Sequence, residues 1–224
     1  MKIIIFAGAP SSGKTSIIKH LLKKIKKVAY FKIDVMFTED EKEIAKFNIP
    51  TKKLYSGELC PDHCFTVVFS DVVEWAKGAD YLFIETAGLC FRCSPYITNT
   101  LGIAVLGVMG GMNLPFKIGP MLTLADMVAI TKSDMISQAE KEVFMARVAQ
   151  RNKGDIIDVD ALRGININKI LKKIEEFEPK GTDYELRGLA PIGVCTLCVG
   201  NKKVGWENNN GVLRKLEGQM YRGE

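Results

Sequence analysis

Short runs of hydrophobic residues alternate along the chain with longer segments in which apolar residues recur at helical spacing. The apolar runs are rich in Val, Ile and Phe without regular alternation, which is typical of strands buried on both faces of a sheet. The runs that predict strands are Lys2–Ala7, Val28–Ile33, Tyr81–Glu85, Ile103–Met109, Met127–Thr131 and Ile156–Val159. The segments that predict helices are Thr15–Lys26, Glu41–Phe47, Cys64–Lys77, Gln138–Arg151 and Asn168–Phe177. This repeating order predicts an α/β fold with a doubly wound, mostly parallel sheet.

The pattern changes after Pro179, where Gly and Asn become frequent and no long periodic segment follows. A chain of 224 residues is long enough for one sizeable α/β domain with a small addition. We therefore expect one domain over residues 1–178 and an appendage over residues 179–224, built of turns or hairpins, with a terminal helix around Val212–Met220 as one option.

Composition excludes several classes of protein. Hydrophobic residues make up 47% and charged residues 25%, an ordinary globular balance. The net charge of +5 is mild, and much of the excess lies on one predicted helix, which favours a solvated helix face over a nucleic-acid surface. No apolar stretch is long enough to span a membrane, and Ile3–Ala7 is too short for the core of a signal peptide. We expect a cytoplasmic protein.

The cysteines fall into close pairs, which are Cys60/Cys64, Cys90/Cys93 and Cys195/Cys198. In a reducing compartment, paired cysteines indicate metal or redox chemistry rather than structural disulfides.

The strongest motif is the run Gly8-Ala9-Pro10-Ser11-Ser12-Gly13-Lys14-Thr15, which matches the phosphate-binding pattern G-x-x-x-x-G-K-[ST] between a predicted strand and a predicted helix. Backbone N–H groups of such a loop surround phosphate oxygens. Lys14 is expected to reach the β- and γ-phosphates, and Thr15 to ligate Mg²⁺. The residues expected to bind the nucleotide's phosphates are Gly8, Pro10, Ser11, Ser12, Gly13, Lys14, Thr15 and Ser16.

Two further strands are predicted to end in carboxylates. Glu85 closes the apolar run Tyr81–Glu85, and Gly88 follows three residues later. Glu85 is expected to hold the Mg²⁺ shell through water, and the Gly88 N–H to meet the γ-phosphate as part of a nucleotide-dependent switch. Asp34 ends the second predicted strand, where it either faces Mg²⁺ or is a plain strand-end acid, and Asp34–Asp40 is the natural first switch.

The base is predicted from Thr131-Lys132-Ser133-Asp134, at the end of another strand. Asp134 can accept hydrogen bonds from guanine N1–H and the exocyclic amine, whereas adenine offers no such pair. Lys132 can lie along the base, and Ala161 can donate its backbone N–H to guanine O6. These residues favour GTP over ATP, although Thr131 stands where guanine-binding proteins usually have Asn.

From Lys2 to Phe177 the order of motifs resembles the nickel metallochaperone GTPases, the hydrogenase-maturation (HypB) and urease-accessory (UreG) proteins, through GAPSSGKT, SGELCPDHC, IETAG and TKSD. The resemblance implies GTP hydrolysis and a nickel or zinc ion bound at Cys60, His63 and Cys64, between the two switches. Turnover is expected to be slow, because the sequence shows no obvious arginine finger. It also implies a nucleotide-dependent homodimer that delivers the metal to a client metalloenzyme or its maturation factors.

The chain departs from this family in its other cysteines. The family commonly has one cysteine after the second switch, whereas this chain has Cys90 and Cys93, and it adds Cys195 and Cys198 in the appendage. Two C-x-x-C units suit a Cys₄ site holding zinc or an iron–sulfur cluster, and the spacing does not choose between them. Arg92, between Cys90 and Cys93, is a candidate arginine finger.

Two other functions stay open beside metal delivery. An iron–sulfur reductive activator or cluster carrier would use the C-x-x-C pairs, although Ala9 stands where such activators often have a second lysine. A non-catalytic, metal-responsive switch would bind nucleotide without hydrolysing it.

Overall fold

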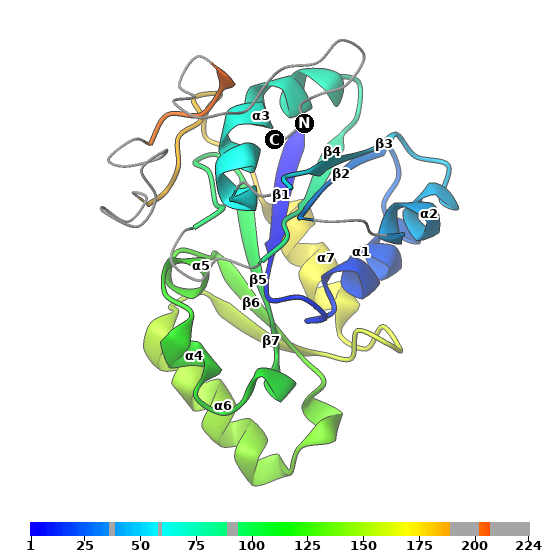
Figure 1. The fold of residues 1–224 in the computed structure, drawn as a ribbon. Helices are drawn as coiled ribbons and strands as arrows, with labels where there is room; N and C mark the ends of the chain where they lie inside the picture. Colours follow the sequence, from blue (N-terminus) through cyan, green and yellow to red (C-terminus); the bar gives the residue numbers. More distant parts are fainter. Residues whose placement is uncertain (36–38, 58–59, 89–93, 189–201, 207–224) are drawn as a thin grey trace.

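The structure is a computed structural model that describes residues 1–35, 39–57, 60–88, 94–188 and 202–206 (Figure 1). A seven-stranded sheet runs through its centre in the order β3-β2-β4-β1-β5-β6-β7, and every neighbouring pair is parallel. The strands are β1 (Lys2–Ala7), β2 (Val28–Asp34), β3 (Thr51–Tyr55), β4 (Tyr81–Glu85), β5 (Leu101–Gly107), β6 (Met127–Thr131) and β7 (Asp155–Val159).

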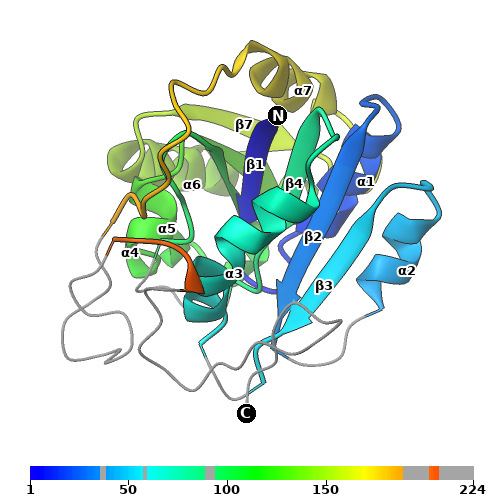
Figure 2. The ribbon, with the colours of Figure 1, turned by 90° about the horizontal axis from the view of Figure 1, so that it is seen from above.

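Helices cover both faces of the sheet, so the predicted doubly wound α/β fold is confirmed (Figure 2). One face packs against α1 (Lys14–Leu22), α2 (Asp40–Ala45) and α7 (Ile167–Glu176). The other packs against α3 (Pro61–Trp75), α4 (Leu114–Lys117), α5 (Pro120–Thr123) and α6 (Gln138–Arg151). Two short 3₁₀ helices, η1 (Val108–Gly110) and η2 (Ser133–Met135), follow β5 and β6. No helix in the described ranges has the length and apolar character needed to cross a membrane.

The topology places the site. The chain passes from β1 to β2 on one side of the sheet and later to β5 on the other, so the direction of winding reverses at β1. In open parallel sheets, ligands bind at the carboxyl ends of the strands where such a reversal occurs. Described residues that follow β1, β4 and β6 line one cavity at this edge, together with residues of β2.

Several predicted boundaries were wrong. Strand β3 was missed because it is an edge strand whose lysines break the apolar run. Leu54 is the buried residue of this strand, and its other residues are partly or fully exposed. The strand predicted to reach Met109 ends at Gly107 and continues as η1. Helix α3 begins at Pro61 rather than Cys64, because proline is well suited to the first helical turn.

The remaining differences concern helix ends and short helices. Helix α1 ends at Leu22, short of the predicted Lys26. Helices α4 and α5 have only four residues each and were not predicted, because so short a helix carries little periodicity.

The described part of residues 179–224 packs on the domain. Leu186 and Val204 are buried in the core cluster that includes α3, and isolated antiparallel bridges join Leu186 to Ile97 and Glu185 to Lys203. This part of the appendage therefore contributes to the main core. The helix proposed around Val212–Met220 lies outside the described residues.

Candidate nucleotide and metal site

The phosphate-binding loop lies between β1 and α1, as its sequence pattern predicts. The Lys14 side chain crosses the loop and donates from Nζ to the carbonyl oxygens of Gly8 at 2.8 Å and Ala9 at 3.1 Å. Burial lowers the pKa of Lys14, an effect that the charge of Glu85 opposes. Ser12 Oγ is buried without a hydrogen-bond partner among the described atoms, so this loop holds a hydroxyl donor suited to an added acceptor.

The loop after β4 touches the phosphate-binding loop at two glycines. Gly88 has φ +69°, and a Cβ added to it would lie 1.6 Å from the carbonyl oxygen of Gly8. Thr86 is tied to β1 by its backbone N–H, which donates to Phe6 O at 3.1 Å. The predicted second switch therefore begins in backbone contact with the phosphate-binding loop.

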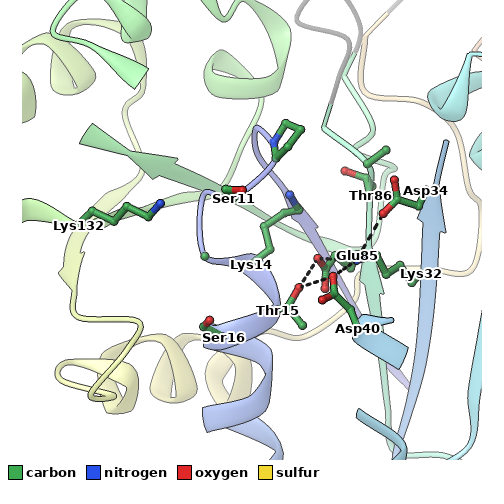
Figure 3. A pocket seen from close by; sticks show the side chains of 13 residues that line it. Ser11, Lys14, Thr15, Ser16, Lys32, Asp34, Asp40, Glu85, Thr86 and Lys132 are labelled. Atoms are coloured by element: carbon green, nitrogen blue, oxygen red, sulfur yellow. Dashed lines mark hydrogen bonds and ion pairs between the residues drawn. The ribbon is translucent and has the colours of Figure 1, made fainter. Parts of the chain in front are cut away.

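A cluster of carboxylates surrounds Thr15. Thr15 Oγ1 donates to Glu85 Oε1 at 2.7 Å and lies 3.3 Å from Asp40 Oδ2 (Figure 3). The Tyr30 hydroxyl donates to the other oxygen of Glu85 at 2.8 Å and so fixes that carboxylate. Hydroxyl and carboxylate oxygens are the donors that Mg²⁺ prefers, so this set fits the ion.

Lys32 lies within the same cluster. Its Nζ pairs with Asp40 and lies 3.5 Å from Glu85 Oε1 and 3.6 Å from Asp34 Oδ2. Burial by itself would lower the pKa of Lys32, but Glu85, Asp40 and Asp34 outweigh it and raise the pKa, so the ammonium stays charged.

These residues line one cavity of about 470 Å³ at the carboxyl edge of the sheet. Figure 3 shows Lys14 between the carboxylate cluster on one side and Lys132 on the other. The lining residues are Pro10, Ser11, Gly13, Lys14, Thr15, Ser16, Lys32, Asp34, Asp40, Glu85, Thr86, Ala87 and Lys132.

The predicted base-binding residues lie beside this cavity. Thr131 Oγ1 donates to the carbonyl oxygen of Ser12 at 2.6 Å, which ties the end of β6 to the phosphate-binding loop. Lys132 lines the cavity, and Asp134 follows it in η2 with an exposed side chain. Ala161, in the turn after β7, lies beside the phosphate-binding loop, since its Cβ is 3.3 Å from a Cβ placed on Gly13. Asp134 and Ala161 are not among the cavity-lining residues.

The Cys/His motif forms the start of α3. Cys60 is half-buried at the N-cap, while His63 and Cys64 are buried in the first turn. Burial raises the pKa of the Cys64 thiol to about 12, which disfavours the metal-binding thiolate. Burial also raises the pKa of Asp62 to about 7. Among the described residues no group of three or more His, Cys, Asp or Glu side chains is placed to hold a metal ion, so these predicted ligands are not gathered into one site here.

Other predicted residues cannot be placed. Arg92 and the two C-x-x-C pairs, Cys90/Cys93 and Cys195/Cys198, lie outside the described residues.

Sequence reasoning missed Tyr30, Lys32 and the individual role of Asp40. A signal was present for Lys32, because it interrupts an apolar strand two residues before Asp34, and positions two apart on a strand face the same side. The partner of Asp40 was not readable, because Asp40 meets Thr15 only through the tertiary fold.

Comparison with known proteins places these features in context. The family model described as "CobW/HypB/UreG, nucleotide-binding domain" matches residues 2–158. An uncharacterized protein from Methanocaldococcus jannaschii is 44% identical over 233 positions, covering 100% of both chains. The hydrogenase/urease maturation factor HypB from Helicobacter pylori is 28% identical over 156 positions, covering 66% of this chain and 62% of that protein.

Two solved structures share the fold. HypB from Archaeoglobus fulgidus superposes with a TM-score of 0.63 at 20% identity, covering 78% of this chain and 89% of that one. HypB from Helicobacter pylori in complex with nickel gives a TM-score of 0.55 at 19% identity, covering 82% and 92%.

Proposed function

The chain belongs to the CobW/HypB/UreG nucleotide-binding family, and from this premise we propose that it is a GTP-hydrolysing metallochaperone. The observation that supports the proposal most directly is the single cavity shared by Lys14, Thr15 and the carboxylates of Asp40 and Glu85. An ammonium on a phosphate-binding loop beside an oxygen-rich cation site suits a nucleoside triphosphate with Mg²⁺.

The residues of the cavity have distinct parts in the proposed hydrolysis. Loop N–H groups hold the phosphates, and Lys14 exchanges the Gly8 and Ala9 carbonyl oxygens for phosphate oxygens. Mg²⁺ supplies positive charge beside the β- and γ-phosphates when it is bound with the nucleotide. Water attacks the γ-phosphorus, the bond from that phosphorus to the bridging oxygen breaks, and GDP and phosphate leave.

The second switch reports the result of hydrolysis in this proposal. Gly88 lies against Gly8, and in this proposal its N–H donates to the γ-phosphate held by the loop. Loss of that phosphate would remove the contact with Gly88.

Guanine is the base we propose. Thr131 donates a hydrogen bond to the phosphate-binding loop, and this bond joins the segment carrying Lys132 and Asp134 to that loop. Asp134 then accepts from guanine, and Ala161 donates its backbone N–H to O6.

The metal that is delivered, nickel or zinc, is proposed to bind at Cys60, His63 and Cys64 across a nucleotide-dependent homodimer. One structural neighbour is HypB in complex with nickel, which supports a nickel cargo. Cys64 is fully buried, so in this proposal metal binding includes exposure of its thiol. A client metalloenzyme in the cytoplasm would receive the ion. Zinc or an iron–sulfur cluster at Cys90, Cys93, Cys195 and Cys198 stays a prediction.

The test is phosphate release from GTP and from ATP by anaerobically purified protein, with Lys14→Ala as the matched inactive variant. We expect slow, Mg²⁺-dependent release that favours GTP and disappears in the variant. GTP binding without hydrolysis would instead identify a non-catalytic switch. Elemental analysis of the same sample tests the iron–sulfur alternative, since stoichiometric iron and acid-labile sulfide would identify a cluster carrier or reductive activator.

A further inference from the structure

A buried lysine stands among the carboxylates of the cation site. Lys32 lies in β2 with 4% of its surface exposed, between residues that are mostly apolar. A buried ammonium is stable only when charged or hydrogen-bonding partners surround it. Its partners are the carboxylates of Asp34, Asp40 and Glu85.

Lys32 and Thr15 interact with the same carboxylate oxygen atoms of Asp40 and Glu85. Glu85 Oε1 accepts from Thr15 Oγ1 at 2.7 Å and lies 3.5 Å from Lys32 Nζ. Asp40 Oδ2 likewise lies 3.3 Å from Thr15 Oγ1 and pairs with Lys32. The ammonium therefore lies next to the position that a cation ligated by Thr15 would occupy.

The charges of the cavity show what this arrangement does. Three carboxylates and three lysine ammonium groups line the cavity, and Lys14 and Lys32 are the lysines that interact with the carboxylates. The carboxylates are therefore already balanced, and a divalent ion placed beside Lys32 is repelled at short range by its positive charge. Nucleotide phosphates would add the negative charge that the cluster lacks.

We propose that Lys32 is a resident counter-ion that makes Mg²⁺ binding depend on nucleotide. Without nucleotide, Lys32 balances the carboxylates and the divalent ion binds weakly. With nucleotide, the phosphates and the same carboxylates together retain the ion beside Lys32. This inference rests on the proposed function, because it assigns a residue to the Mg²⁺ side of the nucleotide site.

The alternative is that Lys32 only fastens α2 to β2 through Asp40, the first residue of that helix. A purely structural pair predicts that its removal weakens divalent-ion binding by loosening Asp40. A counter-ion predicts the reverse, because removing a positive charge from the cluster strengthens divalent-ion binding.

The experiment titrates Mn²⁺, an EPR-visible substitute for Mg²⁺, into the nucleotide-free full chain. We expect Lys32→Met to bind Mn²⁺ about tenfold more tightly than wild type, since neutralising one charge removes a repulsion of that order. Lys32→Arg keeps the charge and should stay near wild type. Lys19→Met removes a lysine that pairs with Glu43 outside the cavity, and should leave the affinity unchanged.

Unchanged or weaker Mn²⁺ binding by folded Lys32→Met overturns the inference. Circular dichroism checks the fold, and if Lys32→Met is unfolded, Lys32→Gln is titrated with the same expected direction and the same overturning result. Binding of a fluorescent GTP analogue to wild type distinguishes failure of the proposed function from failure of the role of Lys32. If the wild type binds no guanine nucleotide, the proposed function is contradicted. If the wild type binds guanine nucleotide but Lys32→Met does not bind Mn²⁺ more tightly, only the role of Lys32 is contradicted.

Discussion

At the scale of single residues, the candidate site depends on positions where only one side chain satisfies the local geometry. Gly88 combines a left-handed backbone with close approach to the Gly8 carbonyl oxygen, so any Cβ there collides with main chain that cannot move independently. Tyr30 contributes through its side chain instead, since its hydroxyl donates to the Glu85 carboxylate and holds it in place. The missing side chain of Gly88 and the hydroxyl of Tyr30 thus help to position the second switch and the cation site.

Gly88→Ala is predicted to uncouple the second switch from the phosphate-binding loop. The added Cβ would lie 1.6 Å from Gly8 O, so the loop after β4 must move away from the nucleotide. We expect GTP hydrolysis to fall by about two orders of magnitude, as when one donor to a reacting oxygen is lost. GTP affinity should fall more than GDP affinity, because the lost contact is to the γ-phosphate. Phosphate release and binding of both nucleotides measure this.

Gly78→Ala is the matched control, because Gly78 also has a left-handed backbone, at φ +100°, but no atom within 4 Å of an added Cβ. It should cost about 1 kcal/mol of stability through backbone strain and leave hydrolysis intact. Equal activity of the two variants would contradict the role of Gly88.

At the scale of elements, the helices differ in how their ends are held. Helix α6 begins with a capping box, in which Ser137 Oγ accepts from the Glu140 N–H and the Glu140 side chain accepts from the Ser137 N–H. Helix α1 begins without a side-chain cap, directly after Gly13. Its uncapped N–H groups are therefore available for phosphate oxygens, whereas at the start of α6 the Glu140 N–H is satisfied by the capping side chain of Ser137.

The capping box of α6 predicts a pH-dependent contribution to stability. Hydrogen bonds from the backbone and side chain of Ser137 lower the pKa of Glu140. A lowered pKa in the folded state means stability that is present above the ordinary glutamate pKa of 4.5 and is lost as pH falls through the folded value. Ser137→Ala should reduce the free energy of unfolding by about 1 kcal/mol at pH 7.

Urea denaturation of wild type and Ser137→Ala at pH 7 and at pH 3 tests this contribution. The difference between the two proteins should shrink as the pH falls from 7 to 3, because protonation of Glu140 weakens its hydrogen bonds with Ser137. A difference that is constant across this range would show that Glu140 takes no part in the cap.

At the scale of the whole molecule, Arg187 makes several of the contacts that hold the C-terminal segment to the domain. Arg187 donates to the carbonyl oxygens of Ile97, Thr100 and Leu124 at 3.1, 2.5 and 2.9 Å. It also pairs with Asp126 at 2.7 Å. Arg187 thereby joins the C-terminal segment to Ile97, to Thr100 just before β5 and to Leu124 at the end of α5. This part of the appendage therefore belongs to the packing of the domain.

Arg187→Ala is predicted to lower the free energy of unfolding by about 2 kcal/mol, because three partly buried carbonyl oxygens lose their donor together. Arg187→Lys should recover little, since one ammonium cannot reproduce the forked geometry of the guanidinium. Arg163→Ala is the control, because Arg163 pairs with Asp160 at the exposed surface and its loss should change stability by less than about 0.5 kcal/mol. Urea denaturation compares the three, and equal effects at Arg187 and Arg163 would refute the anchoring role.

Cys60→Ala tests whether metal and nucleotide binding are separate properties of the molecule. Cys60 lies at the N-cap of α3 and does not line the nucleotide cavity. Nickel affinity should fall at least about tenfold, while the affinity for GTP stays within about twofold, because only a metal ligand has been removed. Calorimetric titration with each ligand measures both. Parallel loss of the two affinities would indicate that Cys60 is structural.

The sequence by itself determined the features that depend on neighbours along the chain. The phosphate-binding loop, the buried strands and the strand–helix order all follow from short-range spacing of glycines and apolar residues, and the fold bears them out. Edge strand β3 and the short α4 and α5 escaped prediction because their apolar periodicity is weak. The roles of Asp134, Ala161 and the cysteines stay predictions.

Only the tertiary structure decided which side chains meet. Thr15 and Glu85 are 70 residues apart in the sequence, and they touch because β4 lies beside β1 in the sheet. Lys32 joins them because β2 lies on the other side of β4, and its partner Asp40 comes from the start of α2. Strand order sets such contacts, and it results from packing the entire sheet between two layers of helices rather than from the residues of any one segment.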